Sequence, residues 1–137
     1  MKVFLDTNVL LDYVCERYPF HADIKQVLIL HERGKIQCIV SALSIVNCAY
    51  IMRKTYKNDD VMRVVRWLCN RFIVSNIDKA AIGNAAKKDY RDFEDAVQYF
   101  SALPSRPDLI LTRDKHGFED LDILVMTPAE FVAESSK

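Results

Sequence analysis

Three aspartates stand at places in the chain where parallel sheets gather their functional groups. Asp6 directly follows the apolar run 2–5. Asp114 closes the segment LILTRD, just after the apolar run 108–111. Asp95 lies in the first turn of the helix predicted before that second run. Because open α/β sheets bind ligands beyond the carboxyl ends of their strands, we expect the three carboxylates to face one another there.

Carboxylates that converge on one place repel each other, so such a cluster either keeps some groups protonated or holds a cation. Ligand sets made of oxygen alone favour hard ions such as Mg²⁺ and Mn²⁺. These ions activate water and clamp phosphoryl oxygens during an in-line displacement. The three aspartates therefore predict a Mg²⁺ or Mn²⁺ site whose chemistry is phosphodiester or phosphoryl transfer.

Other acidic residues near these positions have structural explanations as well. Asp92 can serve as the N-cap of the helix that contains Asp95, and Asp95 itself can complement the helix dipole. Asp12 and Glu94 are explained equally by solvation or a helix contact and by metal binding. A carboxylate straight after a buried strand is rarely idle, so we assign Asp6 a functional role.

Apolar runs and helical patterns alternate along the 137 residues, a length that fits one domain over 1–137. The runs predict strands at 2–5, 36–40, 72–74, 108–111 and 122–125. Helical spacing predicts helices over 8–17, 21–33, 42–57, 60–70, 79–88 and 93–103, and a short last helix after the capping box Thr127-Pro128-Ala129-Glu130. We expect a three-layer α/β/α sandwich with a central parallel sheet of four or five strands.

Composition narrows the class of protein. Nineteen basic and nineteen acidic residues give no net charge, which excludes a strongly basic nucleic-acid-coating protein but leaves room for a local basic patch. Asp6 and Asp12 interrupt the N-terminal apolar stretch, so we predict no signal peptide, and no run is apolar enough to cross a membrane. Scattered histidines and the absence of a CxxC pair argue against zinc and favour a cytoplasmic protein with reduced core thiols at Cys15, Cys38, Cys48 and Cys69.

Four segments carry a family resemblance in the right order and spacing. They are FLDTNVLLD at 4–12, SALSIVNCAY at 41–50, DFEDAVQYFSA at 92–102 and LILTRDKHGF at 109–118. Together with the final VMTPAEF they resemble the PIN domain, the superfamily of metal-dependent ribonucleases that includes the VapC toxins of toxin–antitoxin pairs. The resemblance covers essentially the whole chain.

The resemblance implies a divalent-metal endoribonuclease in which Asp6, Asp95 and Asp114 hold Mg²⁺ or Mn²⁺. Thr7 and Asn8 match the family's polar pair after the first Asp. Thr112 matches the hydroxyl residue that supports the site in that family. The resemblance also implies homodimers and, in the toxin subgroup, an antitoxin whose peptide enters the acidic groove.

One departure from the family pattern concerns Asn47, because many relatives carry a Glu on the helix after the second strand. Ser41, Ser44 and Asn47 lie three apart on one face of that helix, and the metal cleft is a natural polar target for the stripe. Alternatively, Ser44 and Asn47 satisfy one another or nearby backbone groups. A neutral Asn holds a metal less strongly than Glu, so Asp92 or Glu94 would have to supply the missing charge.

Basic side chains beside the carboxylates would hold an RNA backbone near the metal. The candidates are Arg53, Lys54, Lys57, Arg113 and Lys115. A solvated helix face explains the basic residues within 53–71 equally well. No aromatic-interleaved RNA motif is present, so base specificity cannot be read. We expect the aromatic side chains of Tyr13, Tyr18 and Trp67 to pack in the core rather than at an interface.

Three hypotheses follow. In the first, a PIN-type ribonuclease holds its metal with the three aspartates, and Asn47 or Asp92 orients a ligand or water. In the second, Asn47 marks a catalytically weakened PIN domain that binds RNA or a protein. The third is a phosphoacceptor of the receiver or haloacid-dehalogenase type. Against it, the chain has DTN at 6–8 instead of the DxDxT pattern of the dehalogenases. The chain also lacks the Lys that a receiver places after its last strand.

Overall fold

The computed structural model describes all 137 residues and is built on one parallel five-stranded sheet. The strands run in the spatial order β3-β2-β1-β4-β5. Their bounds are β1 (Lys2–Leu5), β2 (Gln37–Ser41), β3 (Ile73–Ser75), β4 (Leu109–Leu111) and β5 (Leu124–Met126). The predicted parallel α/β architecture is therefore confirmed, with five strands.

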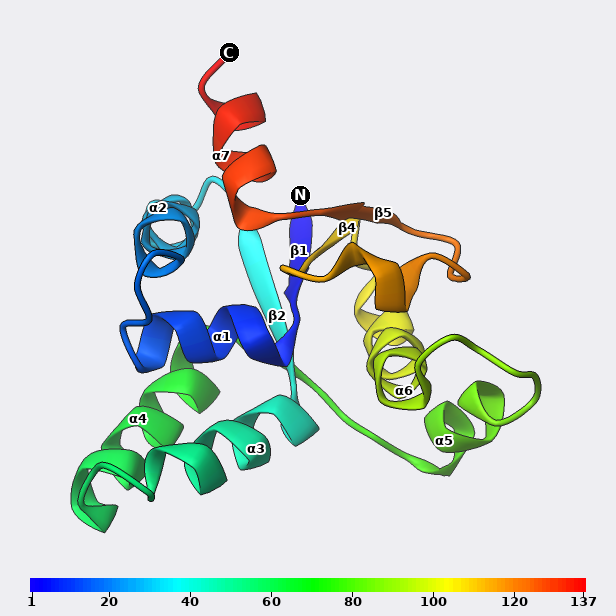
Figure 1. Cartoon of the computed structure of the whole chain (residues 1–137), viewed down its shortest axis with the longest axis horizontal. Coiled ribbons are helices and arrows are strands. Elements are labelled where there is room, and N and C mark those ends of the chain that lie inside the picture. Colours follow the sequence, from blue (N-terminus) through cyan, green and yellow to red (C-terminus); the bar gives the residue numbers. More distant parts are fainter.

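Seven helices cover the two faces of this sheet (Figure 1). They are α1 (Thr7–Val14), α2 (His21–Glu32), α3 (Ala42–Met52), α4 (Asn58–Arg71), α5 (Lys79–Ala85), α6 (Phe93–Ala102) and α7 (Pro128–Ser135). Two short 3₁₀ helices span Leu103–Ser105 and Lys115–Phe118. The element order matches the predicted alternation of strands and helices.

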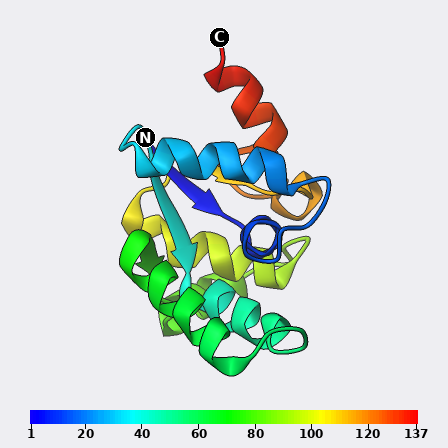
Figure 2. The same cartoon turned by 90° about the vertical axis from the view of Figure 1, so that its left-hand side faces the viewer.

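Alternate residues of the strands point to opposite faces and thereby separate two cores. Val3 and Leu5 pack with apolar residues of α1, α2 and α4 on one face. Phe4, between them, packs with Tyr99 and Ala102 of α6 on the other. Figure 2 shows α2 and α4 lying across the first of these faces, with α7 projecting beyond α2. The predicted three-layer arrangement follows from this alternation.

Three predicted helices end earlier than their sequence pattern suggested. The helix expected over 42–57 ends at Met52, because residues 53–57 are all exposed and offer no face to the core. The helix expected over 79–88 ends at Ala85 for the same reason. The first helix ends at Val14, and Glu16 adopts a left-handed φ of 49° that cannot continue it.

Several predicted core side chains are exposed instead. All four cysteines are free thiols, and Cys38 and Cys48 are buried, but Cys69 is exposed because α4 buries mainly Val61 and Leu68. Tyr18 is 93% exposed, so its predicted core position is wrong. Phe93, the first residue of α6, is also 55% exposed.

The imidazole of His31 ties three elements together. Its Nδ1 accepts the N–H of Cys38 at 3.1 Å, so Nε2 carries the proton and donates to the carbonyl of Arg71 at 2.7 Å. The ring also stacks on Phe72 with centroids 4.9 Å apart. These contacts join α2, β2 and the end of α4.

No helix in the structure has both the length and the apolar character needed to cross a bilayer.

The chain order reverses between β1 and β4, which are neighbours in the sheet. From β1 the chain builds outward through β2 and β3, and then crosses to β4 on the other side. The N–H of Asp6 donates to the carbonyl of Leu111 at 3.0 Å, so the carboxyl ends of the two strands lie together. This is the position where open α/β sheets bind ligands. The order also differs from the 2-1-3-4-5 order of receiver domains, which argues against the receiver form of the phosphoacceptor hypothesis.

Candidate active site

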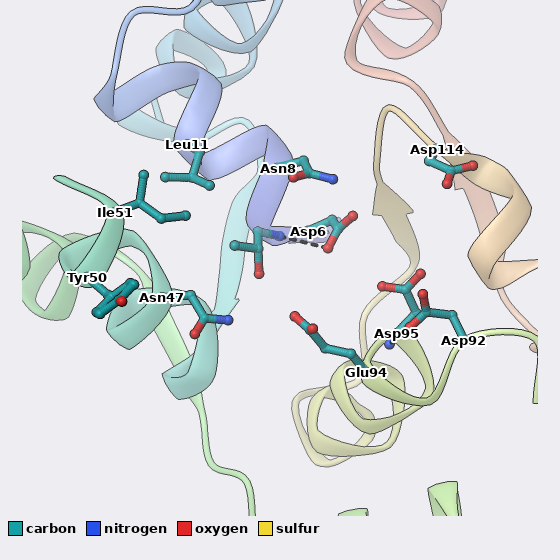
Figure 3. Close-up of a pocket in the computed structure, with 11 residues that line it drawn as sticks. Asp6, Asn8, Leu11, Asn47, Tyr50, Ile51, Asp92, Glu94, Asp95 and Asp114 are labelled. Atoms are coloured by element: carbon teal, nitrogen blue, oxygen red, sulfur yellow. Dashed lines mark hydrogen bonds between the residues drawn. The ribbon is translucent and has the colours of Figure 1, made fainter. Parts of the chain in front are cut away.

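An acidic cavity of about 430 Å³ opens at the carboxyl ends of β1 and β4 (Figure 3). Its walls come from α1, α3, the start of α6 and the loop after β4. The lining residues are Asp6, Thr7, Asn8, Leu11, Asn47, Tyr50, Ile51, Asp92, Glu94, Asp95 and Asp114. Five of these are acidic and none is basic, and they include all three aspartates singled out in the sequence.

Asp6 is the most strongly constrained of these carboxylates and is only 5% exposed. Its Oδ1 accepts the backbone N–H of Thr7 at 2.7 Å and the side-chain amide of Gln98 at 3.1 Å. Its Oδ2 accepts the hydroxyl of Thr112 at 2.8 Å. Burial raises the pKa of Asp6, and the hydrogen bonds from Thr112, Gln98 and Thr7 oppose that rise.

Asp92 and Asp95 combine a structural task with a place in the cavity. Asp92 is the N-cap of α6, as predicted, because its Oδ1 accepts the N–H of Asp95 at 3.0 Å. In Figure 3 the side chains of Asp92, Glu94 and Asp95 all project from the start of α6 toward the cavity. Asp95 packs against Gly117, where a Cβ would overlap its carboxylate. Gly117 therefore leaves room for that carboxylate.

The cavity holds uncompensated negative charge. Burial raises the pKa of Asp95 to about 8, helped by repulsion from Asp6, Asp92, Glu94 and Asp114 in that order. The pKa of Glu94 is also raised, by burial first and then by Asp92 and Asp6. A cation in the cavity would relieve this repulsion.

Asp114 approaches the cavity from the loop after β4. It caps the short helix Lys115–Phe118, with Oδ1 accepting the N–H of His116 at 3.1 Å. The N–H of Asp114 donates to Oγ1 of Thr112 at 3.2 Å, while the same hydroxyl donates to Asp6. Thr112 therefore couples the loop that carries Asp114 to the carboxylate that follows β1.

The polar side chains at the start of α3 have two different roles. Ser44 is fully buried, and its Oγ lies 2.6 Å from Oγ1 of Thr7 and 3.0 Å from Oγ of Ser41. Asn47 instead directs its carboxamide into the cavity, alongside Asn8 from α1 (Figure 3). Ser44 therefore finds its partners in Ser41, Thr7 and Gln98 rather than in Asn47.

Gln98 is the functional candidate that the sequence analysis missed. It is fully buried on α6 and joins Ser44 to Asp6, accepting from Ser44 at 3.1 Å and donating to Asp6 at 3.1 Å. A signal existed in its spacing, because Gln98 follows Asp95 by three residues and so shares its helix face. A glutamine in an otherwise apolar stretch requires buried partners.

Two of the predicted phosphate-binding side chains are engaged elsewhere. Nε of Arg113 lies 2.7 Å from Oδ2 of the buried Asp12, and its guanidinium lies 4.1 Å from the ring centroid of Phe20. Nζ of Lys115 lies 2.8 Å from Oε1 of Glu130. Neither cation lines the cavity. Asp12 likewise lies outside it and serves as the partner of Arg113.

The other three basic candidates lie between the end of α3 and the start of α4. Arg53, Lys54 and Lys57 are all exposed. Nζ of Lys54 lies 5.4 Å from the ring centroid of Tyr50, which is itself 67% exposed and lines the cavity. Lys54 therefore stands near one rim of the acidic cavity.

The donor set of the cavity suits a hydrated divalent cation. Its acidic and amide oxygens are hard ligands, and its charge lacks a counterion. No group of three or more His, Cys, Asp or Glu side chains converges closely enough to hold an ion by itself. Mg²⁺ commonly keeps several waters and binds through one or two carboxylates plus substrate phosphates, which this open arrangement allows.

Structural comparisons show that this chain shares its fold with chains of bacterial toxin–antitoxin structures. A toxin–antitoxin complex from Klebsiella pneumoniae contains a chain that superposes with a TM-score of 0.68 at 21% identity, over 92% of this chain and 97% of that one. FitAcB from Neisseria gonorrhoeae gives 0.66 at 16% identity, over 93% and 98%. The VapC20 toxin of Mycobacterium tuberculosis, described as cleaving the sarcin–ricin loop, gives 0.63 at 14%, over 84% and 92%.

The sequence itself places the chain in a family. A model of the PIN domain matches residues 2–116, which span every lining residue of the cavity. Ribonuclease VapC1 of Aquifex aeolicus (strain VF5) is 32% identical over 134 residues, covering 95% of this chain and 92% of that protein. The chain belongs to the PIN domain family, which confirms the resemblance seen in its motifs.

Proposed function

We propose that this protein is an endoribonuclease that depends on Mg²⁺ or Mn²⁺ and acts as the toxin of a toxin–antitoxin pair. The carrying observation is the cavity that five carboxylates line without a basic residue. Support comes from the similarity to Ribonuclease VapC1 and from neighbours that are toxin–antitoxin proteins. A binding pocket for an uncharged ligand would not gather so much negative charge.

In this proposal Asp6, Asp95 and Asp114 hold a hydrated metal, partly through bound waters, because the three side chains do not converge closely enough to bind it by themselves. When bound, the ion would supply activated water and neutralise charge on a scissile RNA phosphodiester. Asp6 is held in place by three hydrogen-bond donors, and Asp95 must give up its proton to take part. Asn47 faces the same cavity and would orient a water or a phosphate oxygen through its carboxamide.

Single-stranded RNA is the substrate class that the rim favours. The exposed ring of Tyr50 beside the cavity can stack on an unpaired base, and Lys54 lies over the same ring. Arg53, at the end of α3, and Lys57, at the start of α4, are exposed and would contact backbone phosphates. Duplex RNA would present no free base face to Tyr50.

Two protein partners belong to the proposal. An antitoxin would neutralise the cavity by inserting a basic side chain, since the cavity carries five acidic groups and no cation. A second copy of this chain would cover an apolar surface made of Val46, Ile82 and Phe93, which are 64%, 48% and 55% exposed. Phe93 and Ile82 also line a groove with Leu43 and Ile77, between α3, α5 and α6.

The second candidate function is a catalytically weakened PIN domain that binds RNA or protein. It is favoured by Asn47, a neutral side chain that faces the cavity at the position where the resemblance to the PIN domain implies a Glu. The variant Asn47→Glu separates the two candidates. A large gain in cleavage identifies a weakened site, whereas unchanged or lower cleavage shows that the native set already suffices.

The deciding experiment is cleavage of end-labelled single-stranded RNA with Mn²⁺, with and without EDTA. Asp95→Asn tests the cavity, and Asp89→Asn is the matched control because Asp89 is exposed and lies outside the cavity. We expect cleavage by the native protein and by Asp89→Asn, and loss of cleavage with Asp95→Asn or EDTA. Equal cleavage by all three proteins would reject the site.

A further inference from the structure

A chain of buried hydrogen bonds runs beneath the cavity and ends at Asp6. Oγ of Ser41 donates to Oγ of Ser44 at 3.0 Å, and Ser44 donates to Oε1 of Gln98 at 3.1 Å. Nε2 of Gln98 donates to Oδ1 of Asp6 at 3.1 Å. Ser41, Ser44 and Gln98 are all fully buried, so water does not compete for these contacts.

The direction of this chain is determined by its acceptor end. An ionised carboxylate only accepts hydrogen bonds, so the amide of Gln98 must present its nitrogen to Asp6 and its oxygen to Ser44. Ser44 has one proton and uses it toward Gln98. The hydroxyl of Thr7, 2.6 Å from Ser44, must therefore donate to it. Every hydrogen bond in the chain points toward Asp6.

Three of the acceptor positions on the Asp6 carboxylate are filled by hydrogen-bond donors of the protein. A carboxylate has about four lone-pair positions, two on each oxygen. Oδ1 is filled by the N–H of Thr7 and the amide of Gln98. Oδ2 takes the hydroxyl of Thr112 and retains one position. A cation that approaches Asp6 from the cavity must therefore use Oδ2.

We propose that Gln98 is a positioning residue for Asp6. Its hydrogen bond keeps Oδ1 occupied, so that only Oδ2 is available to a cation in the cavity. The inference rests on the proposed function, because it assigns a task toward the cation that this function requires. No other side chain joins α3 to Asp6 by accepting at one end and donating at the other. Without Gln98, Ser44 and Asp6 each lose a buried partner and the carboxylate gains freedom to turn.

The first test measures Mn²⁺ binding alone by isothermal titration calorimetry. Gln98→Met keeps the volume of the side chain but removes both hydrogen-bonding groups. We expect its Kd for Mn²⁺ to rise about 10- to 100-fold, as when partners behind metal ligands are removed. Ser101→Ala is the matched control: Ser101 is buried on the same helix and bonds to Ser75 and the Gln98 carbonyl, but not to Asp6. Its Kd should stay within about twofold of the native value.

A second variant tests whether Ser44 acts on Asp6 only through Gln98. Ser44→Ala should weaken Mn²⁺ binding by a smaller factor, since Gln98 still reaches Asp6. Added to Gln98→Met, it should cause no further loss, because the link that it supports is already gone. Independent, additive losses, or a loss with Gln98→Met no greater than with Ser101→Ala, would overturn the assignment. If Gln98→Met does not fold, an unchanged Kd for Ser44→Ala overturns it as well.

A metal-free measurement separates this inference from the proposed function. Thermal unfolding in EDTA is compared for Asp6→Ala, Gln98→Met and the double variant. Direct coupling predicts that the double variant loses clearly less Tm than the sum of the single losses. If the native protein binds no Mn²⁺, the metal part of the proposed function fails. The Gln98 contact is then decided by this cycle, with additive Tm losses contradicting it.

Discussion

The hydroxyl of Thr112 donates to Oδ2 of Asp6 at 2.8 Å and so joins the carboxyl ends of β4 and β1 beneath the acidic cavity. Oγ1 of Thr112 also accepts the N–H of Asp114 at 3.2 Å. One side chain therefore sets both a buried carboxylate and the loop that carries a second carboxylate. The site depends on this contact between neighbouring strands as much as on the acidic residues.

Replacing that hydroxyl should damage stability and function together. Thr112→Val leaves Oδ2 of the buried Asp6 without its donor, which costs about 1–3 kcal/mol of unfolding free energy. Thr112→Ser retains the donor and should recover most of the Mn²⁺ affinity. Urea unfolding and Mn²⁺ titration of the two variants check this expectation. Equal Mn²⁺ affinity in both would show that the hydroxyl does not matter.

Metal binding should depend on pH through Asp95. Its pKa lies near 8, so at neutral pH the empty site holds a proton that a cation must displace. We expect Mn²⁺ affinity to rise about tenfold per pH unit from pH 6 toward 8 and then to level off. Calorimetry in buffers of different ionisation enthalpy should show release of about one proton. A flat affinity across this range would contradict the role of Asp95.

The same pKa carries a stability consequence with a definite sign. The folded pKa of Asp95 lies above the unfolded value of 3.8, so the native state loses stability as pH rises from about 4 to about 8. Asp95→Asn removes this penalty. In EDTA at pH 8 the variant should melt about 3 °C above the native protein, after allowance for solvent screening. At pH 4 the two should melt alike, and a difference that does not grow with pH would refute the explanation.

Gly117 should be required for the position of Asp95. A methyl group there overlaps the Asp95 carboxylate, so Gly117→Ala should lower RNA cleavage at least about tenfold while the protein remains folded. Gly83→Ala is the matched control, because nothing lies within 4 Å of its Cβ position and it sits inside α5. That change should leave cleavage intact and stabilise the protein by about 0.5–1 kcal/mol.

Arg113 should act as a structural residue rather than a phosphate ligand. Arg113→Ala leaves the buried Asp12 with only Arg17, 3.8 Å away, and should cost about 2 kcal/mol of unfolding free energy. Lys115→Ala breaks an exposed pair with Glu130 and should cost less than about 1 kcal/mol. Guanidinium unfolding compares the two. An Arg113 variant of native stability but weakened RNA binding would reverse the assignment.

Tyr50 should contribute to substrate binding rather than to the chemical step. Tyr50→Ala removes an exposed ring at the rim of the cavity and should raise KM for single-stranded RNA about tenfold, with little change in kcat. Tyr18→Ala, at a ring that is 93% exposed and outside the cavity, should change neither constant. A drop in kcat alone would place Tyr50 in the chemistry instead.

Local patterns were enough to predict the layers and the three aspartates. Strand runs and helical spacing depend on neighbours in the chain, and Asp6 and Asp114 follow strands whose carboxyl ends must meet in a parallel sheet. Asp92 could be read as a cap because capping is a contact over three residues. Helix ends such as Met52 were missed, since they depend on where core contact stops.

Contacts between distant residues required the folded chain. Gln98 reaches Asp6 across 92 positions and Arg113 reaches Asp12 across 101, so the local sequence does not identify either partner. The space that Gly117 leaves for Asp95 is likewise set by the packing of α6 against the 3₁₀ helix Lys115–Phe118. Residue types and spacing thus determined the fold class and the acidic side chains of the cavity, because periodicity and strand ends are local. Which side chains support those carboxylates, and which cations are already paired, depended on distances that only packing creates.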